Sequence, residues 1–284
     1  QLAPGLAPRA LPALVRLYRK LERWPELAEV LSSLAAREAR PEEKSGILFR
    51  LGQTWEERLG SPERAVAAYE AVLQSAPGNL PSLRALERLH EQAGRADALL
   101  QVLAAEREAA EPAARERLTA RMAEVSAGLG RDAEAVELWR EVLRDRPRGE
   151  QALAALEVLL ERQERWAELA EVLRLRIPQA QVQDRREAAR LQEKLGGLLA
   201  ARLGEPGQAV RCFQAVLEGD PRNRGALEAL RDLHAQQGDR ESLAQAYRRL
   251  VPLQEDAAGV KRVRLDLAEV LLALGQRQEA VEQA

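Results

Sequence analysis

Few side chains in this sequence could carry out acid–base, nucleophilic or metal chemistry. The only imidazoles are His90 and His234, which could act as general bases or metal ligands. They stand 144 residues apart in similar segments, Leu-His-Glu-Gln-Ala-Gly and Leu-His-Ala-Gln-Gln-Gly. Two equivalent positions in distant segments do not easily meet, so we expect both histidines to pack inside the fold. The one thiol, Cys212, has no histidine near it in sequence that could act as its base.

Familiar catalytic and ligand-binding motifs are missing as well. The sequence contains no Gly-x-Gly-x-x-Gly, no Walker loop, no His-Glu-x-x-His and no Cys-x-x-Cys. Neighbouring carboxylates such as Glu56-Glu57 are typical of a solvated helix face, and without a nearby histidine, cysteine or metal they define no acid–base pair. Four tryptophans recur at repeat positions and indicate packing: Trp24, Trp55, Trp139 and Trp166. The sequence therefore predicts a protein that is not an enzyme, with no catalytic residue, metal site or cofactor.

Composition predicts helices throughout. The 284 residues include two Ile, two Thr and 3% aromatic residues, so few side chains favour a sheet. The 43 basic and 45 acidic residues are interspersed and leave a net charge of −2, which does not indicate a nucleic-acid partner. No apolar run approaches the roughly 18 residues that a membrane-spanning helix needs, so no membrane insertion is expected.

The compartment stays open, because a lone cysteine fits the cytoplasm only slightly better than the periplasm. Richness in Ala and Arg suggests a GC-rich, bacterial genome.

The chain repeats itself. Ala occupies one position in four similar segments, and Leu replaces it in four weaker copies that alternate with them. The distance from Ala to the next Leu is 34 residues in three cases out of three, whereas the return from Leu to Ala takes 36 to 40. The Ala copies centre on Ala65, Ala135, Ala209 and Ala280, and the Leu copies on Leu27, Leu99, Leu169 and Leu243. This predicts one array over 1–284 with repeats near 8–41, 42–79, 80–112, 113–149, 150–180, 181–223, 224–254 and 255–284.

The best-defined copy runs through Leu51-Gly52, Trp55, Gly60, Ala65, Tyr69 and Pro77. This pattern resembles the tetratricopeptide repeat, a helix-turn-helix of 34 residues. The resemblance implies an all-α fold, a right-handed superhelical solenoid of antiparallel helix pairs. Small residues such as Gly52 would let the first helix approach the second, and Tyr69, Trp139 and Phe213 would fill the gap to the next repeat. This copy has one extra residue near Gly60, and a later copy has one near Gly204.

Proline and glycine mark the expected ends of the helices. Six prolines precede apolar-periodic runs, where proline suits the first helical turn: Pro25, Pro41, Pro62, Pro81, Pro112 and Pro206. Six glycines fall at the turn inside a repeat, where a left-handed residue ends a helix: Gly60, Gly94, Gly130, Gly204, Gly238 and Gly275. Ser61 and Asp132 are expected N-caps. The segments whose length varies between copies, before Leu51, Met122 and Leu195, contain helix-forming residues, so we expect longer first helices there.

The two ends suggest a fragment of a longer array. Ala3-Pro4-Gly5 resembles the close of a preceding repeat, such as Ala76-Pro77-Gly78. The sequence stops at Ala284, midway through an expected second helix, and it has no initiator Met. We therefore expect the array to be truncated at both ends.

The resemblance also implies a binding face. In the family, the first helices line a concave groove, and residues just after the small Gly or Ala point into it. Mapped onto this sequence, the groove carries residues of both signs: Arg16, Arg19, Lys20, Gln53, Glu56, Glu57, Arg88, Glu91, Gln92, Glu124, Glu161, Arg162, Asp232 and Gln236. Alternating charge favours a mixed ligand, such as an amphipathic helix or a folded domain. The Lys, Asn and Arg set with which the family clamps a peptide's C-terminal carboxylate is not found.

Three functions are compatible with these observations. The leading hypothesis is a non-catalytic scaffold that holds a protein, helix or peptide partner of unknown identity in the groove. The alternative is a self-assembling spacer or homo-oligomer, because an open stack of repeats invites head-to-tail contacts. RNA binding is a third hypothesis, but the groove positions vary without the recurrent code of repeats that read one base each.

Overall fold

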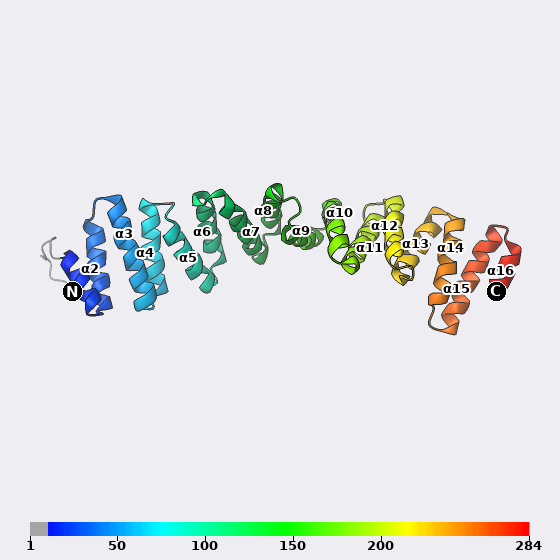
Figure 1. Ribbon diagram of the computed structural model, residues 1–284, viewed down its shortest axis with the longest axis horizontal. Helices are drawn as coiled ribbons and strands as arrows, with labels where there is room; N and C mark the ends of the chain where they lie inside the picture. Colours follow the sequence, from blue (N-terminus) through cyan, green and yellow to red (C-terminus); the bar gives the residue numbers. More distant parts are fainter. Residues whose placement is uncertain (1–10, 284) are drawn as a thin grey trace. The chain divides into compact units, whose positions relative to one another are not determined.

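The computed structural model describes residues 11–283, and every regular element in that range is a helix (Figure 1). The predicted all-α helical-repeat fold is therefore confirmed. The chain divides into two compact units, the N-terminal unit up to Asp145 and the C-terminal unit from Arg146. None of the described helices is long and apolar enough to cross a membrane. The segment Ala3-Pro4-Gly5, the predicted start of the first repeat and Ala284 lie outside the described residues.

In the N-terminal unit each helix packs on the next one along the chain (Figure 1). The first helices of the pairs are α1 (Leu11–Lys20), α3 (Pro41–Gln53), α5 (Leu80–Gln92) and α7 (Pro112–Gly128). The second helices are α2 (Trp24–Arg37), α4 (Pro62–Ser75), α6 (Ala96–Ala109) and α8 (Asp132–Asp145). A π-helical turn, η1 (Thr54–Arg58), continues α3.

The C-terminal unit is built in the same way. Its first helices are α9 (Glu150–Arg162), α11 (Arg185–Ala201), α13 (Arg224–Gln237) and α15 (Ala257–Ala273). Its second helices are α10 (Trp166–Gln183), α12 (Pro206–Gly219), α14 (Arg240–Leu250) and α16 (Arg277–Gln283), with a 3-10 turn, η2 (Val251–Leu253), after α14. We number the helix pairs repeats 1 to 8 in chain order, so that repeat 3 is α5 and α6 and repeat 6 is α11 and α12.

The segments of variable length that precede Leu51, Met122 and Leu195 are helical, as predicted. Helices α7, α11 and α15 have 17 residues each, whereas α5 and α9 have 13. The extra residue near Gly60 is absorbed in η1, where the Leu59 amide donates to the Thr54 carbonyl five residues earlier at 3.1 Å. The Leu203 amide donates to the Leu198 carbonyl in the same way at 3.2 Å, so both insertions widen the last helical turn.

The turn inside each repeat is left-handed. All six predicted glycines have positive φ, between 57° and 77°. Repeats 1 and 5 have no glycine at this turn, and there Glu22 and Glu164 take φ values of 52° and 55°. Glutamate is strained in this region because its Cβ approaches the following carbonyl oxygen. These two positions were not among the predicted left-handed turns.

The expected caps are only partly present. The six prolines do lie in the first turn of a helix, as predicted. Ser61 stands at the N-cap of α4 but makes no capping hydrogen bond from its side chain, and Asp132 is the first residue of α8 rather than its cap. Side chains that do accept a capping bond precede α5, α11, α13, α14 and α15: Asn79, Asp184, Asn223, Asp239 and Asp256.

The small residues of the first helices receive aromatic rings from the second helices. A Cβ added to Gly52 would lie 2.5 Å from Cε1 of Tyr69, and one added to Gly196 would lie 2.9 Å from Cζ of Phe213. The rings of Tyr69 and Phe213 therefore also pack within their own repeat, a contact that the prediction did not include. Tyr69 serves both contacts, since it also belongs to the buried cluster that includes Leu83 and Leu86 of repeat 3.

Candidate functional site

The chemically versatile side chains are embedded in the packing, as expected for both histidines. His90 and His234 are 4% and 8% exposed, and burial lowers the pKa of His90. Cys212 is half-buried beside Gly196, and burial raises the pKa of its thiol, which disfavours the thiolate that a nucleophile needs. Among residues 11–283, no three His, Cys, Asp or Glu side chains cluster as metal ligands.

The tryptophans lie at packing positions. Trp139 is 2% exposed and belongs to the core. The other three are half-buried, and each carries an arginine guanidinium over its ring: Arg58 over Trp24 at 4.8 Å, Arg64 over Trp55 at 4.5 Å and Arg202 over Trp166 at 5.1 Å. These contacts are cation–π interactions, in which a guanidinium stacks over one face of each ring.

In the N-terminal unit, several predicted groove residues form ion pairs between neighbouring repeats. Arg88 of α5 donates to Glu56 of η1 at 2.6 Å, and the Tyr69 hydroxyl donates to the same carboxylate at 2.9 Å. Glu91 at the end of α5 forms an ion pair with Arg121 of α7, which also reaches Glu124 at 3.1 Å. The first helices of repeats 2, 3 and 4 are thus joined by ion pairs.

The C-terminal unit repeats this arrangement. Lys194 of α11 lies 2.7 Å from Glu161 and 2.7 Å from Glu157, both on α9. Glu157 is also paired with Arg176 of α10, which lies 3.5 Å from Glu187. The predicted groove residue Asp232 pairs with its neighbour Arg231 at 2.7 Å. Arg162, the last residue of α9, and Gln236, near the end of α13, are exposed.

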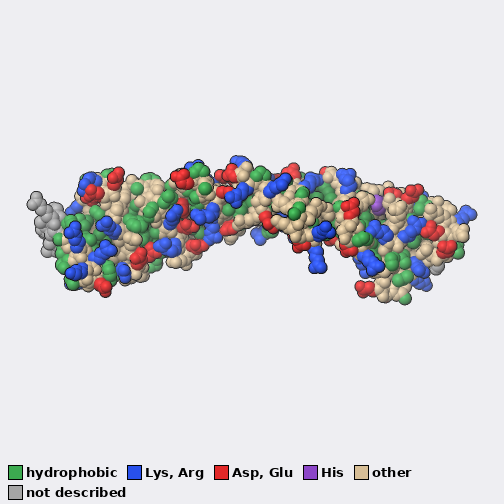
Figure 2. Space-filling model, viewed as in Figure 1, with side chains coloured by type: hydrophobic (Ala, Val, Ile, Leu, Met, Phe, Trp, Pro, Cys, Tyr) green, Lys and Arg blue, Asp and Glu red, His purple; other side chains and the backbone are tan. Residues whose placement is uncertain are grey.

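The expected row of free, alternating charges is therefore only partly available for a ligand. The partners Arg121 and Lys194 were not among the predicted residues, although the spacing of opposite charges along the sequence could have indicated these ion pairs. Opposite charges recur about one repeat apart, at Glu56 and Arg88, Glu91 and Arg121, and Glu161 and Lys194. Figure 2 shows basic and acidic side chains interspersed over the visible face of each unit.

The first two repeats bring three predicted residues together in a pocket. Arg19 of α1, Gln53 of α3 and Glu57 of η1 line a cavity of about 370 Å³ with the apolar side chains of Val15, Trp24, Leu27 and Leu31. Arg50 and Arg58 also line it, so the pocket holds three cations and one carboxylate. Arg16 and Lys20 lie exposed on the same helix as Arg19. Arg16, Arg19 and Lys20 form no ion pair with any described residue.

The fold and its repeat motif have counterparts among known proteins. A sequence model of the tetratricopeptide repeat matches residues 47–79, which cover most of repeat 2. A search of the curated proteins finds no match. A solved structure described as Naa15/Naa10 bound to HypK-THB is similar with a TM-score of 0.55 at 12% identity, covering 93% of this chain and 39% of that one. This chain therefore spans about two fifths of the length of that relative.

Two other solved proteins align less closely. A tetratricopeptide repeat protein from Parabacteroides merdae has a TM-score of 0.38 at 15% identity, with 93% of this chain and 99% of that chain covered. The MamA protein has a TM-score of 0.38 at 11% identity, with 61% and 92% covered. The likeness to the Naa15/Naa10 structure supports the helical-repeat fold, and the sequence match assigns the motif in repeat 2.

Proposed function

Because the chain is a tetratricopeptide-repeat protein, a type of protein-interaction scaffold, we propose that it binds a protein partner through the first helices of repeats 1 and 2, without catalysis. The observation that carries this proposal is the pocket of about 370 Å³ in which Arg19, Gln53 and Glu57 meet. Three predicted groove residues from two repeats converge there on an apolar floor.

Ion pairs within the chain decide which of the predicted groove residues are free to bind a partner. Charges that are already paired between repeats, such as Glu91 and Arg121, must lose that partner before they bind another group. Arg16, Arg19 and Lys20 carry no such cost, and they concentrate positive charge beside the pocket. The partner we expect is an amphipathic helix or a folded domain, with an apolar side chain for the pocket and carboxylates opposite α1.

Two further observations support a non-catalytic role. Burial disfavours the thiolate of Cys212, and His90 is 4% exposed within the packing, so neither side chain is presented to a substrate. The fold resembles a chain from a complex described as Naa15/Naa10 bound to HypK-THB, so a helical array of this kind occurs in an assembly with other proteins.

The test is a pull-down from source-cell lysate with two charge-reversal baits beside the unchanged chain. The first bait carries Arg16→Glu, Arg19→Glu and Lys20→Glu. The second carries Lys261→Glu, Arg262→Glu and Arg264→Glu, an equal charge change on α15. We expect a partner that the unchanged chain and the α15 bait retain and the α1 bait loses. Equal capture by all three baits would contradict the proposal.

Self-association is the second candidate, and the last helix pair favours it. Leu265, Leu272 and Val281 are 42%, 55% and 76% exposed on α15 and α16. Exposed apolar side chains of this size are candidates for contacts between copies of the chain. Light scattering over a range of protein concentrations tests this, because self-association raises the molecular mass with concentration, and Leu272→Glu should abolish the rise.

A further inference from the structure

One pair of positions on the first helices changes its chemistry in repeats 1 and 2. The pair consists of the residue three places before the left-handed turn and the residue two places before the small Gly or Ala of the next first helix. It forms an ion pair twice: Glu91 with Arg121, and Glu161 with Lys194. In repeats 1 and 2 the same positions are Arg19 and Arg50, and both line the pocket of about 370 Å³. Two cations therefore stand where the other repeats join a carboxylate to a cation.

The floor of this pocket also differs from the equivalent place in other repeats. Val15 takes the position of Glu87 in repeat 3 and of Glu157 in repeat 5. It lines the pocket together with Leu27 and Leu31, which are 4% and 3% exposed. Repeat 1 therefore contributes cations and apolar surface to the pocket, and none of its described residues contributes a carboxylate.

The charged residues that line the pocket have a net charge of +2. They are Arg19, Arg50 and Arg58 with the one carboxylate of Glu57, and none of the three arginines forms an ion pair within residues 11–283. Arg58 lies over the Trp24 ring at 4.8 Å, a contact that orients its guanidinium without neutralising it. The pocket is therefore short of negative charge.

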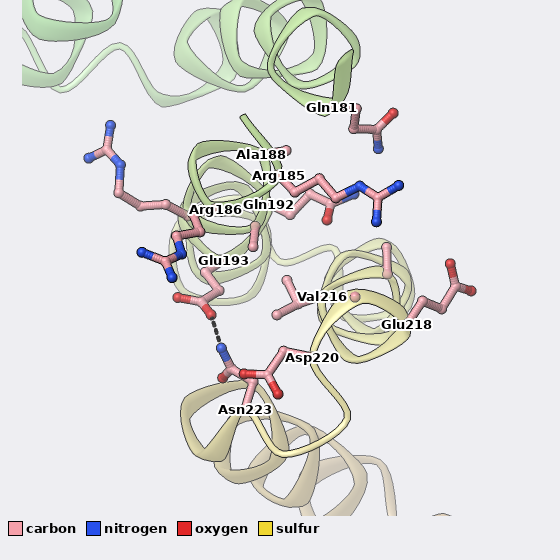
Figure 3. A pocket seen from close by; sticks show the side chains of 14 residues that line it. Gln181, Arg185, Arg186, Ala188, Gln192, Glu193, Val216, Glu218, Asp220 and Asn223 are labelled. Carbon is pink, nitrogen blue, oxygen red and sulfur yellow. Dashed lines mark hydrogen bonds between the residues drawn. The ribbon is translucent and has the colours of Figure 1, made fainter. Parts of the chain in front are cut away.

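The larger pocket of repeat 6 shows that this excess is local. It has a volume of about 610 Å³ and lies between the start of α11 and the end of α12 (Figure 3). Three arginines and three carboxylates line it, so their formal charges balance: Arg185, Arg186, Arg190, Glu193, Glu218 and Asp220. That balance gives no preference for an anion, whereas the excess in repeats 1 and 2 does.

We propose that the pocket of repeats 1 and 2 binds the phosphate group of a phosphorylated tyrosine in the protein partner. The inference rests on the proposed function and specifies which partner side chain enters the site. A phosphate monoester carries a charge of about −1.5 to −2 at pH 7, which matches the net charge of +2, whereas a carboxylate supplies a single charge. Its oxygens can accept hydrogen bonds from several guanidinium groups at once.

The apolar floor selects the group that carries the phosphate. An aromatic ring can pack on Val15, Leu27 and Leu31 while the phosphate at its far end reaches the arginines. A phosphorylated serine has no such apolar body, and its phosphate lies closer to the backbone of the partner. Arg16 and Lys20, exposed on the same helix, stay available for acidic residues that flank the phosphotyrosine.

The test uses fluorescein-labelled, C-terminally amidated peptides of seven residues that differ only at the central position. This position is phosphotyrosine, tyrosine, glutamate or phosphoserine, and leucine, alanine and glycine flank it on both sides. Fluorescence anisotropy should show saturable binding of the phosphotyrosine peptide, and binding about tenfold or more weaker for the tyrosine and glutamate peptides. Equal affinity for the glutamate peptide would overturn the assignment of a phosphate, and equal affinity for the phosphoserine peptide would overturn that of the ring.

Two variants test the pocket itself. Arg19→Glu gives repeat 1 the residue of repeats 3 and 5, and the new carboxylate can pair with Arg50. The melting temperature should therefore not fall, whereas the affinity for the phosphotyrosine peptide should fall about tenfold or more. Arg50→Glu makes the same pair in the reverse order and should give the same result. The control is Arg262→Glu on α15, which changes the net charge equally and should bind like the unchanged chain. Undiminished binding by both pocket variants would overturn the proposal.

The inference and the proposed function fail separately. A pull-down from phosphatase-treated lysate repeats the comparison of the α1 and α15 baits. If the unchanged chain still captures a partner that only the α1 bait loses, the proposed function stands and the assignment of a phosphate fails. If the phosphotyrosine peptide binds as expected and all three baits capture the same proteins from untreated lysate, the pocket assignment stands and the proposed function fails.

Discussion

Repeats 3 and 5 have the same backbone plan and opposite chemistry at one buried place. Helices α5 and α9 are both 13 residues long and start 70 residues apart, and α6 and α10 keep the same offset. Glu87 on α5 corresponds to Glu157 on α9. Their partners differ, because the position that faces them is Glu106 in α6 and Arg176 in α10.

The difference sets the protonation and pairing of each site. Glu157, whose side chain is 6% exposed, is paired with Arg176 and with Lys194. In repeat 3, Glu106 is 4% exposed and lies 3.3 Å from Arg84, but its Oε2 atom has no hydrogen-bond partner among the described residues. Burial raises the pKa of Glu87, and the neighbouring charge of Glu106 raises it further. One framework therefore accommodates a closed ion pair in one unit and two opposed carboxyl groups in the other.

The formation of a repeat and the stability of that repeat thus depend on different residues of this chain. The spacing of small and apolar residues is enough to place the helices, whatever charges they enclose. The enclosed charges then decide how much each repeat contributes to stability and at which pH. The following changes test this separation, beginning with the largest expected effect.

Arg176→Glu gives repeat 5 the residue of repeat 3. It leaves Glu157 buried opposite a like charge, and we expect a loss of about 3 kcal/mol or more from the C-terminal unit. Hydrogen exchange measured by mass spectrometry should show faster exchange in α9, α10 and α11. The control is Arg174→Glu on the same helix, whose side chain is 45% exposed and which should cost far less. Unchanged protection in α9 would show that the pair is not important for stability.

Glycine contacts extend the comparison to repeats 2 and 6. Gly52→Ala and Gly196→Ala should each cost about 1–3 kcal/mol, more at Gly52, because the new methyl group meets Tyr69 at 2.5 Å and Phe213 at 2.9 Å. Gly197→Ala is the control, since nothing lies within 4 Å of its added Cβ, and it should stabilise by about 0.5–1 kcal/mol. Thermal unfolding checks both. Similar losses from Gly196→Ala and Gly197→Ala would mean that the ring contact has no cost.

Glu106→Arg makes the reverse exchange in repeat 3. It places a cation opposite Glu87 and removes the unpartnered Oε2 atom, but it also removes the contact of 3.3 Å with Arg84, whose side chain is 64% exposed. Because an exposed ion pair contributes little, we expect the N-terminal unit still to gain up to about 1 kcal/mol at pH 7. Chemical denaturation, together with the exchange protection of α5 and α6, measures the gain. Glu106→Gln is the matched variant without the positive charge and should gain less. A loss of stability with Glu106→Arg would show that the two repeats are not interchangeable here.

Glu87→Gln tests the pH dependence. A carboxyl group whose pKa is raised on folding contributes stability below its ordinary value of 4.5, and this is lost as pH rises through the raised value. The variant and the unchanged chain should therefore have similar stability near pH 4, and the variant should become the more stable one above that. Thermal melts at a series of pH values give the difference. A constant difference across the series would exclude the ionisation of Glu87 as its cause.

The smallest expected effect concerns the turns of repeats 3 and 5. Gly94 and Glu164 occupy the same left-handed position, with φ of 65° and 55°. Glu164→Gly should stabilise by about 0.5–1 kcal/mol, and Gly94→Glu should cost about as much, because only the glycine is free of strain from a Cβ there. Melting temperatures of the two variants should shift in opposite directions. Shifts in the same direction would show that strain is not what separates the two turns.

Much of the fold could be predicted because its determinants are local. The prolines in first helical turns, the six glycines in left-handed turns and the longer first helices all depend on backbone preferences within a few residues. Ser61 does stand at the N-cap of α4 as predicted, but its side chain makes no capping hydrogen bond, and the N-cap predicted at Asp132 was wrong, because that residue is the first of α8. Capping depends on which rotamer reaches a backbone amide and not on residue type alone. Glu22 and Glu164 were not predicted, because these turns close with the same local hydrogen bonds as the others, from the Arg23 amide to the Tyr18 carbonyl and from the Arg165 amide to the Leu160 carbonyl at 2.9 Å, without a glycine to mark them.

From the sequence, the candidate site could be predicted only as the face formed by the first helices, and not as the individual residues that are free to bind. The resemblance selected first-helix residues such as Arg19, Gln53 and Glu57, which the structure does bring to one pocket. It did not identify the cations Arg121 and Lys194, which neutralise other members of the same set.

The sequence by itself determined the period, the helical class and most helix ends, because each depends on apolar spacing and on proline or glycine at fixed offsets. Only the tertiary structure decided which charges are free. Ion pairs such as Glu56–Arg88 join residues more than thirty positions apart, and their formation depends on distances of a few ångströms between neighbouring helices. Those distances follow from how Tyr69, Phe213 and the small residues pack, which the order of the residues does not state.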